Sequence, residues 1–162
     1  MDNKENVFKK LDELSISYKV IYHEAAYTIE GMEALHLENM KDVAKNLFLR
    51  DYKGRKHYLV VLEKDKMADL KYIKTQIGST PLSFASEERL MKYLKLSKGS
   101  VSPLGVLNDA EGEVMVVFDK ELALKEKIGV HPNDNTATVF MDFKDLQKVI
   151  ELNGNKICFI DI

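Results

Sequence analysis

The sequence of 162 residues contains one cysteine, three prolines and no tryptophan. Its single cysteine, Cys158, excludes an intramolecular disulfide and any metal site built from several cysteines, and is typical of a reducing compartment. The longest apolar runs, Tyr58–Leu62 and Val114–Phe118, have strand length and fall far short of the ~20 residues that cross a bilayer. No apolar segment follows the charged N-terminus, so no secretion signal is predicted. We therefore expect a cytoplasmic protein with no membrane partner.

Neither sign of charge is in large excess. The chain has 24 Lys and Arg against 26 Asp and Glu, which gives a formal net charge of −2. Because nonspecific phosphate binding needs a strong basic excess, this balance excludes a protein that holds nucleic acid by bulk positive charge, and we expect no DNA partner. Six cations fall in one region, and they allow two interpretations. They could form a small basic site, or they could be the solvated face of a hairpin. These cations are Lys41, Lys45, Arg50, Lys53, Arg55 and Lys56.

The composition that is present is that of a globular protein. Hydrophobic residues make up 45% and charged residues 31%, which is too apolar for a disordered chain. The length matches one domain of roughly 100–200 residues. No low-complexity tract, internal repeat or Pro/Gly/Ser-rich linker divides the sequence, so we expect a single domain over 1–162.

Hydrophobic periodicity predicts short helices that alternate with strands. Helices are predicted over about 3–14, 28–37, 67–78, from 86 onward with Leu90, Met91 and Leu94 buried, 120–127 and 142–152. Strands are predicted over 17–22, 43–50, 57–62, 106–108, 114–118, 136–141 and 157–160. Polar turns around Gly54 and Gly112 predict two hairpins. A purely parallel design does not fit this order, so the predicted class is α+β, with a mixed, largely antiparallel sheet flanked by helices.

Several familiar sites are missing. The sequence has no glycine-rich phosphate loop, no Gly-x-Ser-x-Gly elbow and no His-Glu-x-x-His motif. The four histidines lack the close spacing of metal ligands, so neither a metal nor a cofactor is expected. They are His23, His36, His57 and His131.

Three other segments are unusual, and the first is Lys45-Asn46-Leu-Phe-Leu. In a strand, alternation places Lys45, Leu47 and Leu49 on one face and Asn46 on the other. The lysine would then stand beside an apolar wall. The alternative is that Lys45 lies at the strand end and extends its ammonium into water.

The other two segments combine glycine, proline and polar residues. The second segment is Lys98-Gly99-Ser100-Val-Ser102-Pro103-Leu-Gly105. An irregular backbone here could turn free N–H groups toward a carbonyl oxygen. The alternative is an ordinary loop between a helix and a strand, which fits the same residues. In Gly129-Val-His131-Pro132-Asn133-Asp-Asn135-Thr136, the proline favours an extended histidine that could enter a cleft. The alternative there is a solvated turn.

Taken together and in this order, the three segments resemble the YbaK/ProX family of aminoacyl-tRNA editing domains, most closely its stand-alone prolyl-tRNA editing branch. The resemblance extends to Phe84-Ala-Ser-Glu-Glu-Arg89-Leu and to Leu107-Asn-Asp109, and so covers nearly the whole chain. It implies a hydrolase that acts in trans on alanine wrongly attached to tRNA(Pro). Mischarged Ala-tRNA(Pro) is then the expected partner, and prolyl-tRNA synthetase a transient one.

The resemblance also implies roles for individual residues. The expected catalytic set is Lys45, Gly99, Ser100, Ser102 and His131. The expected substrate-binding set is Asn46, Pro103, Gly105, Gly129, Pro132 and Asn135. Because an aminoacyl ester is already activated, backbone N–H groups around Gly99–Ser102 could stabilise the oxyanion, with a ribose hydroxyl orienting the water and no nucleophilic side chain. The alternatives are a deacylase for Cys-tRNA(Pro) or another small residue, and a non-catalytic module that binds tRNA or a synthetase.

Overall fold

The computed structural model describes residues 2–37 and 39–162. Its α-helices are α1 (Asn3–Glu13), α2 (Ile29–Ala34), α3 (Leu70–Ile77), α4 (Glu87–Leu94) and α5 (Phe143–Leu152). Three 3-10 helices are η1 (Met40–Asp42), η2 (Pro103–Asn108) and η3 (Lys120–Leu124). The strands are β1 (Tyr18–Tyr22), β2 (Ala44–Arg50), β3 (His57–Glu63), β4 (Ser83–Phe84), β5 (Val114–Asp119), β6 (Lys127–Val130), β7 (Ala137–Asp142) and β8 (Ile157–Ile160).

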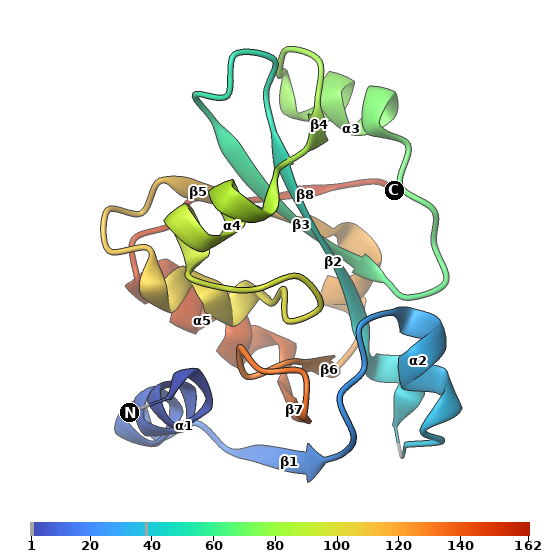
Figure 1. Cartoon of the computed structure of the whole chain (residues 1–162), viewed down its shortest axis with the longest axis vertical. Helices are drawn as coiled ribbons and strands as arrows, with labels where there is room; N and C mark the ends of the chain where they lie inside the picture. The colour runs from blue at the N-terminus through green and yellow to red at the C-terminus, as the bar shows by residue number, and fades with distance from the viewer. Residues whose placement is uncertain (1, 38) are drawn as a thin grey trace.

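The strands form two sheets, and the place where they meet positions the site (Figure 1). The larger sheet has the order β4-β2-β3-β5-β8 and mixes antiparallel pairs with the parallel pairs β3/β5 and β5/β8. The smaller one, β1-β7-β6, is antiparallel. A single parallel bridge between Val43 and Gly129 joins the start of β2 to β6. The predicted α+β class with a mixed, largely antiparallel arrangement is confirmed, although the strands divide between two sheets.

The larger sheet separates two apolar clusters. On one face Phe48 and Leu59 belong to a cluster that also contains buried residues of α1, α4 and α5. On the other face Leu49 and Val60 pack in a cluster with Ile73 of α3. Successive residues of β2 and β3 thus point to opposite faces and both faces are covered, which explains why β3 is apolar along nearly its whole length.

Local sequence signals explain most helix ends. Thr28 and Ser86 cap α2 and α4 by accepting hydrogen bonds from the N–H groups of Gly31 and Arg89. Gly78 ends α3 in the left-handed region, at φ +68°. The predicted hairpin around Gly54 is confirmed, because β2 and β3 pair antiparallel from Arg50 and His57 onward.

The second predicted hairpin, around Gly112, is wrong. Residues 106–108 belong to η2, and β5 pairs in parallel with β3 and β8. The buried carboxylate of Asp109 accepts hydrogen bonds from the N–H groups of Glu113 and Val114 and from the Asn155 amide, so a side chain holds this turn in place of a partner strand.

Three smaller predictions also differ from the structure. Met91 was expected to be buried but is 52% exposed, because α4 turns it outward. The helix predicted over 67–78 begins only at Leu70, which leaves Met67 outside it and 91% exposed. The helix predicted over 120–127 stops at Leu124, and β6 follows from Lys127. That strand includes Gly129, which the sequence placed in a loop.

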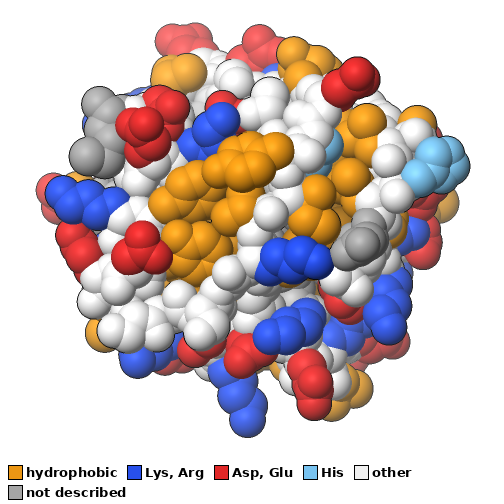
Figure 2. Space-filling model, turned by 90° about the horizontal axis from the view of Figure 1, so that it is seen from below, with side chains coloured by type: hydrophobic (Ala, Val, Ile, Leu, Met, Phe, Trp, Pro, Cys, Tyr) orange, Lys and Arg blue, Asp and Glu red, His pale blue; other side chains and the backbone are white. Residues whose placement is uncertain are grey.

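The surface is mixed in charge. Figure 2 shows the molecule from the side where α1 and β1 lie in Figure 1, with hydrophobic patches bordered by both lysines and carboxylates and no broad basic field. Within residues 2–37 and 39–162, no helix combines the length and apolar character needed to span a membrane.

A buried histidine links stability to pH. His57, 2% exposed, packs on Tyr93 with ring centroids 4.0 Å apart, and its Nε2 accepts a hydrogen bond from Arg89 at 3.2 Å. Desolvation, helped by the positive charge of Arg89, lowers the pKa of His57 to about 4. The unfolded chain therefore binds more protons between pH 6.5 and pH 4, and the stability present above pH 6.5 is lost as pH falls through this window.

We expect this residue to account for at most about 3 kcal/mol of the acid-induced loss of unfolding free energy. Chemical denaturation at several pH values measures it, with His57→Gln expected to show a shallower pH dependence than the unsubstituted chain. The matched control is His36→Gln, because His36 is exposed. Equal slopes for His57→Gln and the unsubstituted chain would contradict this assignment.

Candidate active site

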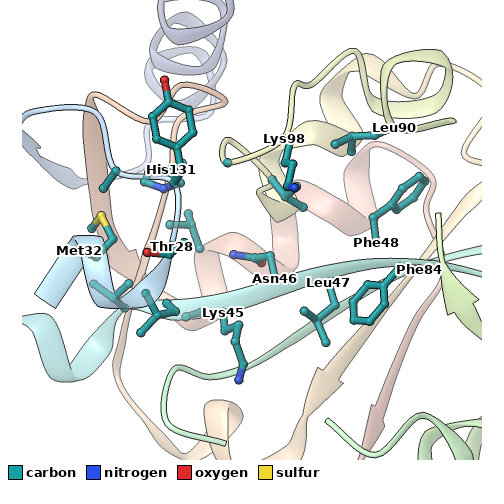
Figure 3. A pocket seen from close by; sticks show the side chains of 18 of the residues that line it. Thr28, Met32, Lys45, Asn46, Leu47, Phe48, Phe84, Leu90, Lys98 and His131 are labelled. Carbon is teal, nitrogen blue, oxygen red and sulfur yellow. The ribbon is translucent and has the colours of Figure 1, made fainter. Parts of the chain in front are cut away.

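A pocket of about 600 Å³ lies where the two sheets meet (Figure 3). All three unusual segments contribute to its wall, together with the residues before and within α2 and the start of α4. The volume is in the range typical of small-molecule sites, and most of the lining is apolar. The apolar side chains include Ala26, Met32, Val43, Phe48, Phe84, Leu90 and Val130.

Two neighbouring polar residues of strand β2, Lys45 and Asn46, point to opposite sides. Figure 3 shows Asn46 on the pocket side of β2 and Lys45 pointing away below it. The Asn46 Oδ1 is buried and has no hydrogen-bond partner among the described residues. Lys45 lies on the face of Leu47 and Leu49, as alternation predicted, and its Nζ donates to the carbonyl oxygen of Lys66. Asn46 therefore offers a free polar atom in the pocket wall, whereas the Lys45 ammonium is held at the edge.

A smaller, polar pocket of about 380 Å³ adjoins this edge, and Lys45 lines both. Lys64 forms an ion pair with Glu33 of α2 at 2.8 Å, and the hydrogen bond that Lys64 donates to Glu33 raises the pKa of Lys64. Lys66 forms a second ion pair, at 2.7 Å, with the buried carboxylate of Asp119. Since Lys64 and Lys66 are already neutralised by carboxylates, Lys45 is the cation here without an acidic partner among the described residues.

Gly99 brings the backbone of the second segment close to the pocket. It has φ +90°, and a Cβ at this position would lie 2.5 Å from the ring of Tyr27. Within the described chain, the N–H groups of Gly99 and Val101 donate to no protein acceptor, whereas the Ser100 N–H donates to the Ser97 carbonyl at 3.1 Å. Gly99 and Val101 both line the pocket, so this loop brings two N–H groups without a protein acceptor to its wall, and donors of this kind can stabilise an oxyanion.

The other residues predicted in this segment lie behind the wall. Ser100 and Ser102 are buried, and the Ser102 hydroxyl caps η2 by accepting from the Leu104 N–H. Pro103 starts η2, and a Cβ on Gly105 would meet Leu96 at 2.7 Å. These four residues do not line the pocket. They support the loop that does.

The third segment brings His131 to the pocket. Its Nδ1 lies 2.9 Å from the carbonyl oxygen of Ala137. Since a carbonyl can only accept, Nδ1 carries the proton and Nε2 of the neutral ring is an acceptor. Burial, assisted by the nearby His23, lowers the pKa of His131. The ring is therefore neutral at pH 7.

The remaining predicted residues of this segment have different positions. Gly129 lines the pocket from β6, and a Cβ there would lie 2.6 Å from the ring of Phe140. Pro132 is buried, and the Asn135 carbonyl accepts from the Ala26 N–H at 3.3 Å. Neither lines the pocket, so both shape the loop around His131.

Thr138 and His23 were not among the predicted site residues. Thr138 lines the pocket from β7, and His23 lies behind it with Nε2 2.8 Å from the Thr138 Oγ1. Strand alternation could show that Thr138 points inward, but a threonine in a strand is usually only a packing residue. The pairing with His23, 115 positions away, has no local signal.

The described residues hold no group of three or more His, Cys, Asp or Glu side chains arranged to ligate a metal. What the pocket offers is a small apolar volume with two free backbone N–H groups, a neutral imidazole and an unpaired amide oxygen. Such a set can hold a small acyl group and stabilise negative charge on its carbonyl oxygen.

Comparisons with known proteins agree with this chemistry. Residues 23–149 match the model of the aminoacyl-tRNA editing domain. The prolyl-tRNA editing protein ProX of Acetoanaerobium sticklandii is 57% identical over 162 residues, covering 100% of this chain and 99% of that protein. The prolyl-tRNA synthetase associated domain-containing protein 1 of Mus musculus is 32% identical over 152 residues, with 91% and 89% covered.

Solved structures support the fold. A candidate trans-editing enzyme for prolyl tRNA synthetase superposes with a TM-score of 0.74 at 19% identity, over 100% of this chain and 98% of that one. At this identity the likeness concerns the fold alone. The family match spans most of the chain, and the relatives match over nearly their whole length. The chain therefore belongs to the family of aminoacyl-tRNA editing domains.

Proposed function

We propose that this chain is a trans-acting deacylase that hydrolyses the ester of mischarged Ala-tRNA(Pro). The observation that carries the proposal is the small apolar pocket with two unused backbone N–H groups at its wall. The 57% identity to a prolyl-tRNA editing protein supports the choice of tRNA. Aminoacylated tRNA is then the main partner, prolyl-tRNA synthetase a transient one, and the cytoplasm the site of action.

The proposed reaction is direct attack by water. Water adds to the ester carbonyl carbon, and the N–H groups of Gly99 and Val101 stabilise the resulting oxyanion. The bond to the ribose oxygen then breaks, and that oxygen takes up the proton that the attacking water gave up, which releases alanine and tRNA. No cysteine lines the pocket, and the buried hydroxyls of Ser100 and Ser102 lie outside it, so neither serine is assigned as a nucleophile.

The side chains around the pocket take supporting roles in this proposal. Asn46, with its unpaired oxygen, contacts the polar part of the aminoacyl group. His131, neutral and fixed by Ala137, shapes the same wall. Lys45 binds a phosphate of the tRNA end from the pocket edge, for which its ammonium must leave the Lys66 carbonyl.

A deacylation panel tests the proposal. Purified protein is incubated with alanyl-, cysteinyl-, seryl- and prolyl-tRNA(Pro), and the loss of each ester is followed. We expect fast loss of the alanyl ester and little loss of the prolyl ester. If cysteinyl-tRNA(Pro) alone is hydrolysed, the substrate assignment is wrong. If every ester is bound but left intact, the chain is a binding module and not an enzyme.

Discrimination against proline should depend on pocket size. Met32 is 3% exposed and lines the pocket from α2. Because excluding a larger group needs a tight wall, Met32→Ala should lower the ratio of kcat/KM for alanyl over prolyl esters by about 10-fold or more. Deacylation rates on both esters measure the ratio.

The matched control for this change is Met91→Ala, since Met91 is half exposed on α4 and lies outside the pocket. It should leave the ratio unchanged. Truncating a buried methionine costs about 2–5 kcal/mol, so thermal unfolding must first show that Met32→Ala is folded. A folded Met32→Ala protein with the original ratio would show that Met32 does not limit the pocket.

A further inference from the structure

His23 and Thr138 form a hydrogen-bonded pair at the pocket wall, with Thr138 lining the pocket and His23 behind it. His23 follows β1, and its backbone N–H donates to the Thr136 carbonyl at 2.9 Å. Its ring Nδ1 lies 2.8 Å from the Glu24 carbonyl oxygen, and its Nε2 lies 2.8 Å from the Thr138 Oγ1. The residue is thus held at three points, two of them on the ring.

These contacts set the direction of the Thr138 hydroxyl. A carbonyl oxygen only accepts, so Nδ1 of His23 carries a proton, and in the tautomer protonated only at Nδ1 the Nε2 atom has a free lone pair. The Thr138 hydroxyl must then donate its proton to His23. Since Thr138 is 1% exposed and has no other side-chain partner among the described residues, its oxygen can only accept from a group in the pocket.

His131 repeats the same polarity beside it. Its Nδ1 donates to the Ala137 carbonyl, which leaves Nε2 as an acceptor. The two imidazole rings are 6.1 Å apart between centroids. Two neutral acceptors, Thr138 and His131, therefore line the pocket. The Ala137 carbonyl orients the ring of His131 directly. The Glu24 carbonyl orients the ring of His23, which in turn orients the Thr138 hydroxyl.

An aminoacyl ester has one donor that suits this wall. Within the aminoacyl group the carbonyl and ester oxygens accept hydrogen bonds and the alanine side chain is a methyl group, so the α-amino group is its one donor; the neighbouring ribose hydroxyl is assigned to the attacking water. We propose that His23 is a positioning residue that orients the Thr138 hydroxyl, so that Thr138 accepts a hydrogen bond from the α-amino group of the substrate. This inference rests on the proposed deacylase function.

The test combines side-chain and substrate changes. Thr138→Val removes the hydroxyl with little change of shape, Thr138→Ser keeps it, and His23→Asn removes the ring nitrogen that receives the proton. We expect Thr138→Val and His23→Asn each to lower kcat/KM on alanyl-tRNA(Pro) by about 10- to 100-fold, as for loss of a hydrogen bond to a charged group. Thr138→Ser should stay within about 3-fold of the unsubstituted chain.

Two readouts separate positioning from a structural role. If His23 acts through the Thr138 hydroxyl, the variant that combines Thr138→Val with His23→Asn should have a kcat/KM no lower than that of the more impaired single variant. On propionyl-tRNA(Pro), which lacks the α-amino group, both variants should match the unsubstituted chain. His36→Asn, at an exposed histidine outside the pocket, is the control and should behave as unsubstituted on both esters.

Additive losses in the double variant, or equal losses on the alanyl and propionyl esters, would overturn the role of His23 and Thr138. Thr138→Val also answers the question if His23→Asn does not fold, because its loss must vanish on the propionyl ester. Absence of any turnover of alanyl-tRNA(Pro) by the unsubstituted chain is a different result. It would overturn the proposed function, and this inference with it.

Discussion

Replacing Gly99 by alanine should lower kcat/KM on Ala-tRNA(Pro) by about 100-fold or more, the cost of losing an aligned oxyanion donor. The added Cβ would lie 2.5 Å from the Tyr27 ring and 3.3 Å from the Tyr27 Cα, so the Gly99 backbone or residue 27 must move. A shift of the Gly99 backbone displaces the loop's N–H groups, which need alignment to within fractions of an ångström. Single-turnover deacylation measures the effect on the chemical step.

Gly154 supplies a control with almost the same backbone. Gly154 has φ +93° against +90° for Gly99, and a Cβ there would meet no atom within 4 Å. Gly154→Ala should therefore share the strain of the left-handed region, about 1–2 kcal/mol of unfolding free energy, and keep full activity. If Gly99→Ala retains activity within about 3-fold of Gly154→Ala, the Gly99 loop does not supply the oxyanion donors.

Replacing Lys45 should have a comparable effect. We expect Lys45→Ala to lower kcat/KM by roughly 100-fold, because a charge-assisted bond to a tRNA phosphate contributes about 1.5–3 kcal/mol in a partly buried site. Lys45→Met keeps the aliphatic stem along the pocket wall and removes only the charge, so it should lose as much. Deacylation rates at several substrate concentrations separate KM from kcat.

The salt dependence distinguishes a phosphate contact from other roles of this lysine. Removing one phosphate contact should reduce the slope of log KM against log salt concentration by about 0.7, the value for a single-stranded end. Lys144→Ala is the control, since Lys144 is exposed on α5 and outside both pockets. An unchanged salt slope in Lys45→Met would show that Lys45 does not bind phosphate, and unchanged turnover would remove it from the site.

Much of the fold could be predicted because its signals are local. Thr28, Ser86 and Gly78 act at helix ends through bonds within a few residues, and the polar turn at Gly54 joins two strands that pair directly. The turn at Gly112 has the same Asp-x-x-Gly pattern as the turn at Gly54, but it does not form a hairpin. There the carboxylate of Asp109 and the distant Asn155 hold the chain, and β5 finds its partners elsewhere in the sheet.

The sequence predicted which segments form the site, but it did not predict which of their residues line the pocket. Lys45, Gly99 and His131 lie in three stretches that do meet at one pocket. Within those stretches, sequence did not separate residues that line the pocket from those that hold the loop. Ser102 and Pro103 belong to the second kind because η2 buries them.

The sequence by itself determined the α+β class, most helix ends, the first hairpin and the three segments that meet at the pocket, because each depends on periodicity or on neighbours along the chain. Only the tertiary structure decided that Asn46 faces the pocket while Lys45 turns to Lys66, since alternation defines two faces without saying what covers them. It also decided the pairing of His23 with Thr138. That contact exists because β1 and β7 are neighbours in a sheet, which no local pattern records.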